Sequence, residues 1–181
     1  MKDIQLHEDL MFEHDELLDL VDENDQVIGQ LERTQVHAQG LHNFRSVNAF
    51  LVNPRGELWI PRRAAHKKIC PLGFDMSISG HVSSGETYDQ AFFREALEEV
   101  NLDMAQHPYR VLGKVTPHEH GVFAFEQVYA LEVTDAPSYN TFDFVGYEWL
   151  TPEDVLKRIA AGDKAKGDLP KLVQLFLHEI F

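Results

Sequence analysis

Three features that are scarce in this 181-residue sequence exclude several classes of protein. It has a single cysteine, Cys70, so no internal disulfide can form, and this cysteine usage fits a reducing compartment. No apolar run approaches the length of a membrane span, and the first ten residues lack the apolar core of a signal peptide. We therefore expect a soluble, cytoplasmic protein without a membrane partner.

Basic residues are also scarce. Sixteen Lys and Arg stand against 30 Asp and Glu, which gives a formal net charge of −14. Such an acidic chain repels nucleic acid and anionic membranes, so we expect neither as a partner. A small phosphorylated ligand stays compatible where metal ions and a local basic patch reverse the field. The length and the 44% hydrophobic content indicate one globular domain over residues 1–181.

Four of the few basic residues are concentrated in one short stretch. They are Arg62, Arg63, Lys67 and Lys68, and His66 lies among them. A solvated loop is the plainer interpretation. Arg binds phosphate through two parallel hydrogen bonds and Lys as a point charge, so these residues are also candidates for holding substrate phosphates.

The most informative stretch is 80–102, which reads GHVSSGETYDQAFFREALEEVNL. Thr87 followed by Gln90 is a capping box, which predicts a helix beginning at this point. At 3.6 residues per turn, one stripe of that helix is apolar and the opposite side is acidic. The predicted apolar stripe is Phe93, Ala96, Leu97 and Val100, and the acidic side is Glu95, Glu98 and Glu99.

The acidic side destabilises an isolated helix. Like charges at these spacings repel by a few tenths of a kcal/mol, and the helix dipole disfavours anions in the last turns by roughly 0.3–1 kcal/mol each. Arg94 can relieve Glu98 but not all three carboxylates. A solvated acidic face is the alternative, but clustering at the unfavourable end favours a site for a divalent cation such as Mg²⁺.

The same stretch resembles the Nudix box, G-x5-E-x7-R-E-U-x-E-E-x-G-U, where U is aliphatic. The family's fixed polar and glycine positions are matched by Gly80, Glu86, Arg94, Glu95, Glu98 and Glu99. Two positions depart from the pattern, with Ala96 at an aliphatic position and Asn101 at the final glycine. Asn is the next-best residue for a left-handed position after a helix. Neither change removes a carboxylate, so we expect a competent box.

The resemblance implies a fold, a reaction and roles for single residues. It implies the Nudix fold, an α/β/α sandwich, and hydrolysis of a phosphoanhydride in a nucleoside diphosphate linked to a moiety X, with Mg²⁺ (or Mn²⁺) as cofactor. Glu98, Glu99 and the Gly80 carbonyl are then expected metal ligands, and Glu95 a ligand or general base. Glu86 and Arg94 are expected to pair and tie the loop to the helix. Many members add a carboxylate from a later strand, and Glu126 is the first candidate, Glu119 the second.

Two other functions compete with hydrolysis. Beyond the box, residues 17–160 resemble the Nudix branch related to isopentenyl-diphosphate isomerase. Those isomerases carry a catalytic Cys before the Gly-His pair and a second His before the first core strand, where this chain has Ser79 and Phe44. Neither His37 nor His42 restores the pattern, and the isomerases have a degraded box, so hydrolysis is favoured. A catalytically silent module that binds a nucleotide is the third interpretation.

The rest of the chain reads as a mixed sheet between helices, an α/β fold. We expect a loose arm over 1–15, a hairpin of 17–21 with 27–31 and a polar connection over 33–43. Helices are expected from Thr151 and over 169–181. Between the strands over 109–116 and 122–133, a loop with His118 and His120 is favoured over a zinc site. Further strands are expected over 47–52, 57–60, 75–79 and 146–150.

Substrate choice and oligomeric state stay open at this level. Aromatic side chains at Phe44, Trp59, Phe123 and Tyr139 can stack on a base, but aromatic residues in strands more often belong to the core. A homodimer is possible by analogy with the family alone.

Overall fold

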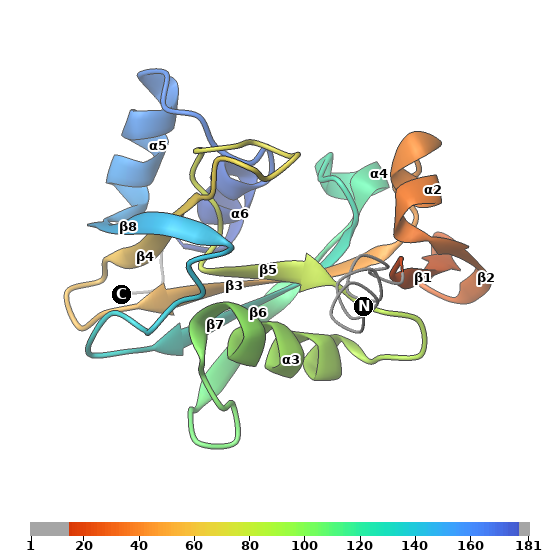
Figure 1. The fold of residues 1–181 in the computed structure, drawn as a ribbon, viewed down its shortest axis with the longest axis horizontal. Helices are drawn as coiled ribbons and strands as arrows, with labels where there is room; N and C mark the ends of the chain where they lie inside the picture. Colours follow the sequence, from red (N-terminus) through yellow and green to blue (C-terminus); the bar gives the residue numbers. More distant parts are fainter. Residues whose placement is uncertain (1–14, 178–181) are drawn as a thin grey trace, which may run out of the picture.

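The computed structural model describes residues 15–177, so the arm predicted for 1–15 lies almost wholly outside the described residues. Its centre is a six-stranded mixed sheet (Figure 1) in which five strands have the order β6-β7-β3-β4-β8, and the sixth, β5, pairs with β3 outside this order. β3 runs parallel to β7 and antiparallel to β4 and β5. The strands are β3 (Arg45–Val52), β4 (Leu58–Arg63), β5 (Ile78–His81), β6 (Tyr109–Val115), β7 (Phe125–Glu132) and β8 (Phe144–Leu150).

Helices cover both faces of this sheet (Figure 1), which confirms the predicted α/β/α sandwich. On one face, α3 (Tyr88–Val100) packs its buried side chains against alternate residues of β3. On the other face, α5 (Pro152–Ala160) and α6 (Leu169–Phe176) pack against the intervening residues of β3, whose side chains point the opposite way. Alternate side chains of β3 therefore belong to two separate hydrophobic cores, one on each face of the sheet, as expected for a central strand. None of the helices described over 15–177 has the length and apolar character to cross a membrane.

The N-terminal hairpin is present as predicted, but the segment after it differs from the prediction. β1 (Leu17–Val21) and β2 (Val27–Glu32) form a separate two-stranded sheet. Residues 33–43, expected as a polar connection, begin with the short helix α2 (Arg33–Ala38), whose buried residue is Val36. The expected loop at His118 and His120 is likewise one helical turn, α4 (Pro117–His120).

The ends of α3 follow the prediction, whereas its apolar side is rotated. Thr87 and Gln90 form the capping box, and Asn101 adopts the left-handed conformation at φ 53°. The buried residues are Ala91, Phe92, Ala96 and Val100. Phe93 and Leu97, predicted to be buried, are 39% and 56% exposed. The prediction of one stripe was wrong because Phe92 packs flat on Tyr129 of β7, which sets the face that the helix turns to the sheet.

Candidate active site

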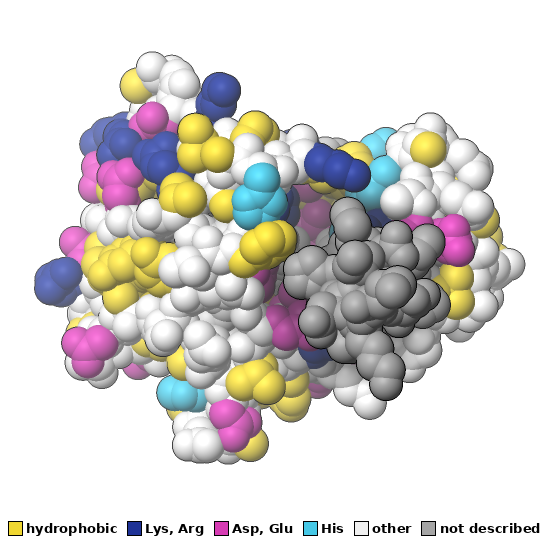
Figure 2. Space-filling model, viewed as in Figure 1, with side chains coloured by type: hydrophobic (Ala, Val, Ile, Leu, Met, Phe, Trp, Pro, Cys, Tyr) yellow, Lys and Arg dark blue, Asp and Glu magenta, His cyan; other side chains and the backbone are white. Residues whose placement is uncertain are grey.

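A cleft of about 1350 Å³ opens between α3, β5, α2, α4 and the loop before α6. Figure 2 shows acidic side chains inside a hollow near the centre of the molecule. The cleft is much less acidic than the whole chain, because the charged residues that line it are nearly balanced. Its acidic residues are Glu16, Glu95, Glu98, Glu99, Glu126, Asp143 and Asp168, and its basic residues are Arg33, Arg63, Lys67, Arg94, Lys166 and Lys171.

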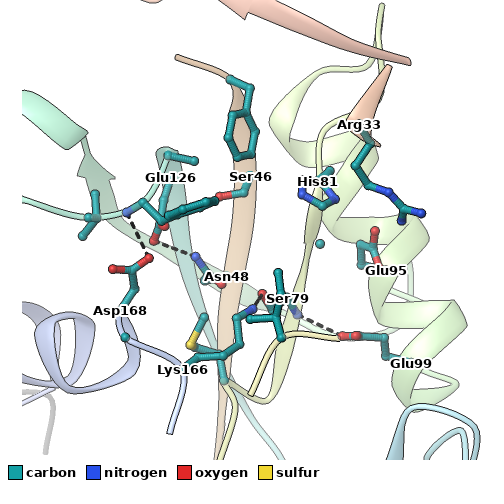
Figure 3. A pocket seen from close by; sticks show the side chains of 18 of the residues that line it. Arg33, Ser46, Asn48, Ser79, His81, Glu95, Glu99, Glu126, Lys166 and Asp168 are labelled. Atoms are coloured by element: carbon teal, nitrogen blue, oxygen red, sulfur yellow. Dashed lines mark hydrogen bonds between the residues drawn. The ribbon is translucent and has the colours of Figure 1, made fainter. Parts of the chain in front are cut away.

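Strand register places one wall of the cleft. Ser46 of β3 lies opposite Glu126 of β7, and Asn48 lies opposite Ser79 of β5. Residues that lie opposite each other in a sheet point to the same face. The side chains of Ser46, Asn48, Ser79 and Glu126 therefore share one face, and Figure 3 shows them around a common space.

The opposite wall is the acidic side of α3. Glu95 and Glu99 are half-buried and point toward the cleft, whereas Glu98 is 58% exposed at its rim. Glu99 Oε2 accepts a hydrogen bond of 2.9 Å from the backbone N–H of Ser79. Gly80 is tightly packed against Glu95, because a Cβ at this position would overlap the Glu95 carboxylate. The glycine that opens the box therefore leaves room for the Glu95 carboxylate in its present position.

Glu86 and Arg94 tie the loop of the box to its helix. Arg94 donates to both carboxylate oxygens of Glu86, through Nε at 2.8 Å and Nη2 at 2.9 Å. Its Nη2 also donates to the His81 carbonyl at 3.0 Å, and its Nη1 donates to Glu95 at 2.6 Å. The guanidinium therefore holds the pKa of Glu86 below its usual range. It also orients Glu95.

Burial disfavours the ionised forms of two box carboxylates. Burial raises the pKa of Glu95 to about 7, although Arg94 opposes the rise. Burial and the nearby Glu95 raise the pKa of Glu99 well above its usual range. Within residues 15–177, no three His, Cys, Asp or Glu side chains are already grouped as a metal site. The hard oxygen donors and the uncompensated charge nevertheless fit a divalent cation such as Mg²⁺.

Glu126, the candidate from a later strand, lies in the same cleft. It is 3% exposed, and its Oε2 accepts a hydrogen bond of 2.8 Å from Asn48 Nδ2. Burial, followed by the nearby Asp168, raises the pKa of Glu126 to about 8. Glu119, the second candidate, is exposed on α4 and does not line the cleft.

The predicted basic loop is divided between two places. Arg63 and Lys67 line the cleft, where they pair with Asp75 and Asp143. Arg62 does not line it, because its guanidinium pairs with Glu148 at 3.0 Å and lies over the ring of Phe74. Lys68 is exposed and is also absent from the lining. The geometry therefore supports only Arg63 and Lys67 of the four proposed phosphate ligands.

An aromatic cluster closes the α2 end of the cleft. Phe44 is buried and contacts the rings of His37 and His81 at centroid distances of 5.8 and 5.6 Å. Phe123 is 41% exposed and stacks on His37 at 5.9 Å. Of the aromatic residues predicted to stack on a base, Phe123 alone is both largely exposed and in the cleft lining. Trp59 is fully buried in the core.

The sequence interpretation missed several residues of the cleft. Asn48, Lys166 and Asp168 line it, as do Glu16 and Arg33 near its α2 end. Residues 163–168 are mostly polar and carry no apolar periodicity, so no local signal marks Lys166 and Asp168. Arg33 begins the short helix α2, and it was missed because that helix was not predicted.

Comparison with known proteins places this geometry in a family. The model of the NUDIX domain matches residues 42–169. An uncharacterized Nudix hydrolase of Nostoc sp. is 50% identical over 161 residues, covering 89% of this chain and 95% of its own. The crystal structure of DR0079 from Deinococcus radiodurans superposes with a TM-score of 0.84 at 47% identity, covering 88% of this chain and 98% of that one.

A more distant relative belongs to the branch that the sequence suggested. An isopentenyl-diphosphate Δ-isomerase of Klebsiella pneumoniae is 30% identical over 148 residues, covering 78% of this chain and 79% of the isomerase. Nudix hydrolases act on pyrophosphate bonds of small phosphorylated compounds and generally use divalent metals. With the box on α3 and the matches over most of its length, the chain belongs to the Nudix hydrolase family.

Proposed function

We propose that this chain is a Mg²⁺-dependent pyrophosphohydrolase that cleaves a phosphoanhydride in a nucleoside diphosphate linked to a moiety X, including nucleoside di- and triphosphates. The observation that carries the proposal is the pair of half-buried carboxylates Glu95 and Glu99, which face the cleft with raised pKa values. A half-buried carboxylate without a full set of cationic or hydrogen-bonding partners destabilises the folded protein, and a bound divalent cation offsets that loss of stability.

The proposed ligands are the box carboxylates Glu98 and Glu99, Glu95, the Gly80 carbonyl and, from the opposite wall, Glu126. A bound divalent cation would supply charge neutralisation at the phosphates and a more acidic bound water. Arg94 holds Glu95 by its 2.6 Å hydrogen bond, so the carboxylate is oriented to accept a proton from an attacking water. The Ser79 N–H holds Glu99 in the same manner.

The basic residues of the cleft are proposed to orient the substrate. Arg63 and Lys67 lie at one end, and each is already paired with an aspartate. Such pairs fix the direction of a cationic side chain before substrate binds, which lowers the entropic cost of binding. With six basic residues set against seven acidic ones in its lining, the cleft repels an anionic substrate less than the rest of this acidic chain does, and a bound divalent cation would make the local charge positive.

An isomerase-like activity toward an isoprenoid diphosphate is the second candidate, favoured by the Klebsiella pneumoniae relative. Two features of the cleft oppose it. Ser79 replaces the expected Cys, and a hydroxyl is a far weaker acid and nucleophile than a thiol. Phe44 replaces the second His and places an apolar ring against both His37 and His81. A silent nucleotide-binding module is disfavoured because every box carboxylate is retained.

A substrate panel tests these functions. Nucleoside di- and triphosphates, dinucleoside polyphosphates, nucleotide sugars and isopentenyl diphosphate are incubated with the chain in Mg²⁺, in Mn²⁺ and in EDTA. We expect cation-dependent release of phosphate-containing products from a nucleotide and none from isopentenyl diphosphate. Conversion of isopentenyl diphosphate to its isomer would support the second candidate. Binding of a nucleotide without turnover would support the silent module.

A matched pair of variants tests the box. Glu99→Gln, or Glu98→Gln, is expected to lower turnover by two or more orders of magnitude without lowering the melting temperature. Glu153→Gln on the exposed side of α5 removes the same charge far from the cleft and is expected to leave turnover unchanged. Equal activity of the Glu99 and Glu153 variants would reject the assignment.

A further inference from the structure

Lys166 lies in the cleft between Glu126 on one wall and Glu99 on the other (Figure 3). Its Nζ donates a hydrogen bond of 2.8 Å to Ser79 Oγ and lies 3.3 Å from Asp75 Oδ1. The backbone holds it there, because Lys166 N–H donates to the Phe74 carbonyl and Phe74 N–H donates to the Lys164 carbonyl. Strand-like pairing therefore holds the backbone at Lys166, and the contacts with Ser79 and Asp75 hold its ammonium.

The charge around Lys166 is not balanced by its nearest partner. Asp75 is 1% exposed and pairs with Arg63 through one oxygen and with Lys166 through the other. One buried carboxylate thus pairs with two half-buried cations, which leaves this group of three side chains with a net positive charge. Lys166 lines the cleft next to the space between Glu99 and Glu126 (Figure 3).

The hydrogen-bond donors of Lys166 and Ser79 also indicate a site for an anion. An ammonium has three N–H donors and no acceptor, and two of the Lys166 donors are directed to Ser79 and Asp75. Because Ser79 Oγ accepts from Lys166, its own hydrogen needs another acceptor. No acceptor for it is found among residues 15–177. One N–H of Lys166 and the O–H of Ser79 are therefore available in the cleft.

We propose that Lys166 and Ser79 form a paired donor site for an anionic phosphoryl oxygen of the substrate. The identity of this anion rests on the proposed hydrolase function. The site explains why Ser suits position 79 in this chain, since a hydroxyl accepts from Lys166 and donates to the anion at the same time, whereas a thiol does both weakly. A phosphoryl oxygen of the substrate would then accept from the Ser79 O–H and from the remaining N–H of Lys166. Hydrogen bonds to a charged group in a partly buried site are strong.

Binding of methylenediphosphonate, whose P–C–P bridge resists hydrolysis, tests the site without any turnover. Titration calorimetry in Mg²⁺ and in EDTA compares the wild type with Lys166→Met and Ser79→Ala. Lys164→Met is the matched control, because Lys164 lies two residues away in the same loop with an exposed side chain. We expect the Kd to rise about 10- to 100-fold for Lys166→Met and several-fold for Ser79→Ala, with no change for Lys164→Met.

Kinetics with the substrate found in the panel add a second readout. Both variants are expected to raise KM more than they lower kcat, whereas a purely structural role would lower the melting temperature and leave the Kd of the folded fraction unchanged. Removal of Lys166 also takes a partner from Asp75, so Ser79→Ala decides the question if Lys166→Met does not fold. Unchanged probe affinity in Ser79→Ala and in folded Lys166→Met would overturn the proposal.

The two proposals fail in different ways. A wild type that binds methylenediphosphonate through Lys166 but hydrolyses no nucleotide refutes the hydrolase function and supports the donor site. A wild type that hydrolyses nucleotides, with wild-type KM and probe affinity in both variants, overturns the donor site alone. A wild type that does not bind the probe even in Mg²⁺ also counts against the donor site.

Discussion

Replacement of Glu126 by Gln is expected to stabilise the metal-free protein at high pH. Glu126 is 3% exposed, and burial and the nearby Asp168 raise its pKa to about 8 from an ordinary value of 4.5. In the unfolded chain this carboxyl loses its proton near pH 4.5, whereas in the folded protein it keeps the proton until about pH 8. The unfolded state therefore binds fewer protons in this window, and stability falls as pH rises through it.

The size of the effect follows from the two pKa values. Their difference corresponds to a ceiling of about 5 kcal/mol at pH values above 8. Relaxation and water penetration around the ionised carboxylate reduce that ceiling, so we expect a gain of about 1–3 kcal/mol. An amide cannot ionise, and its oxygen can still accept the hydrogen bond from Asn48.

Urea unfolding in EDTA between pH 5 and 9 measures the difference between the variant and the wild type. The variant is expected to gain stability steadily from pH 5 to pH 8, with little difference at pH 5. Glu132→Gln is the control, because Glu132 is the exposed last residue of the same strand, and it is expected to show no trend with pH. A constant difference across the pH range, or a loss that grows with pH, would refute the reasoning.

Three further predictions concern the loop and helix of the box and Glu16 near the α2 end of the cleft. Thr87→Ala removes the capping box of α3 and is expected to cost about 1 kcal/mol in urea unfolding, with KM unchanged. Gly80→Ala places a Cβ in the Glu95 carboxylate, so we expect a large loss of turnover and of Mn²⁺ affinity by titration calorimetry. Burial raises the pKa of Glu16, but hydrogen bonds from His81 and Ser83 outweigh it and lower the pKa to about 2 from 4.5. Glu16→Gln should therefore be less stable than the wild type above pH 4.5, with a difference that vanishes as pH falls toward 2 in thermal melts.

The elements that could be predicted from the sequence are those determined by residues close together in the chain. The caps of α3 were readable because Thr87, Gln90 and Asn101 act within one turn of the helix. The box carboxylates were readable because their spacing is fixed by helical geometry. The strands were found by apolar runs between turn residues, with errors of a few residues at their ends.

The parts that were missed depend on contacts between distant segments. The buried face of α3 could not be chosen from Phe92 or Phe93 alone, because the choice is made by stacking on Tyr129. Helix α2 has Val36 as its buried residue, which gives no periodicity to detect. Lys166 and Ser79 lie 87 positions apart, and only the fold brings them together.

The pairing of Phe74 with the segment 164–166 makes the length of this loop a structural constraint. Successive side chains of an extended segment alternate between opposite sides. Adding or deleting a single residue ahead of Lys166 would therefore turn its ammonium away from Ser79, even though every residue of the box stayed unchanged. The number of residues in this loop is therefore as constrained as the residues of a motif, although no sequence motif marks it.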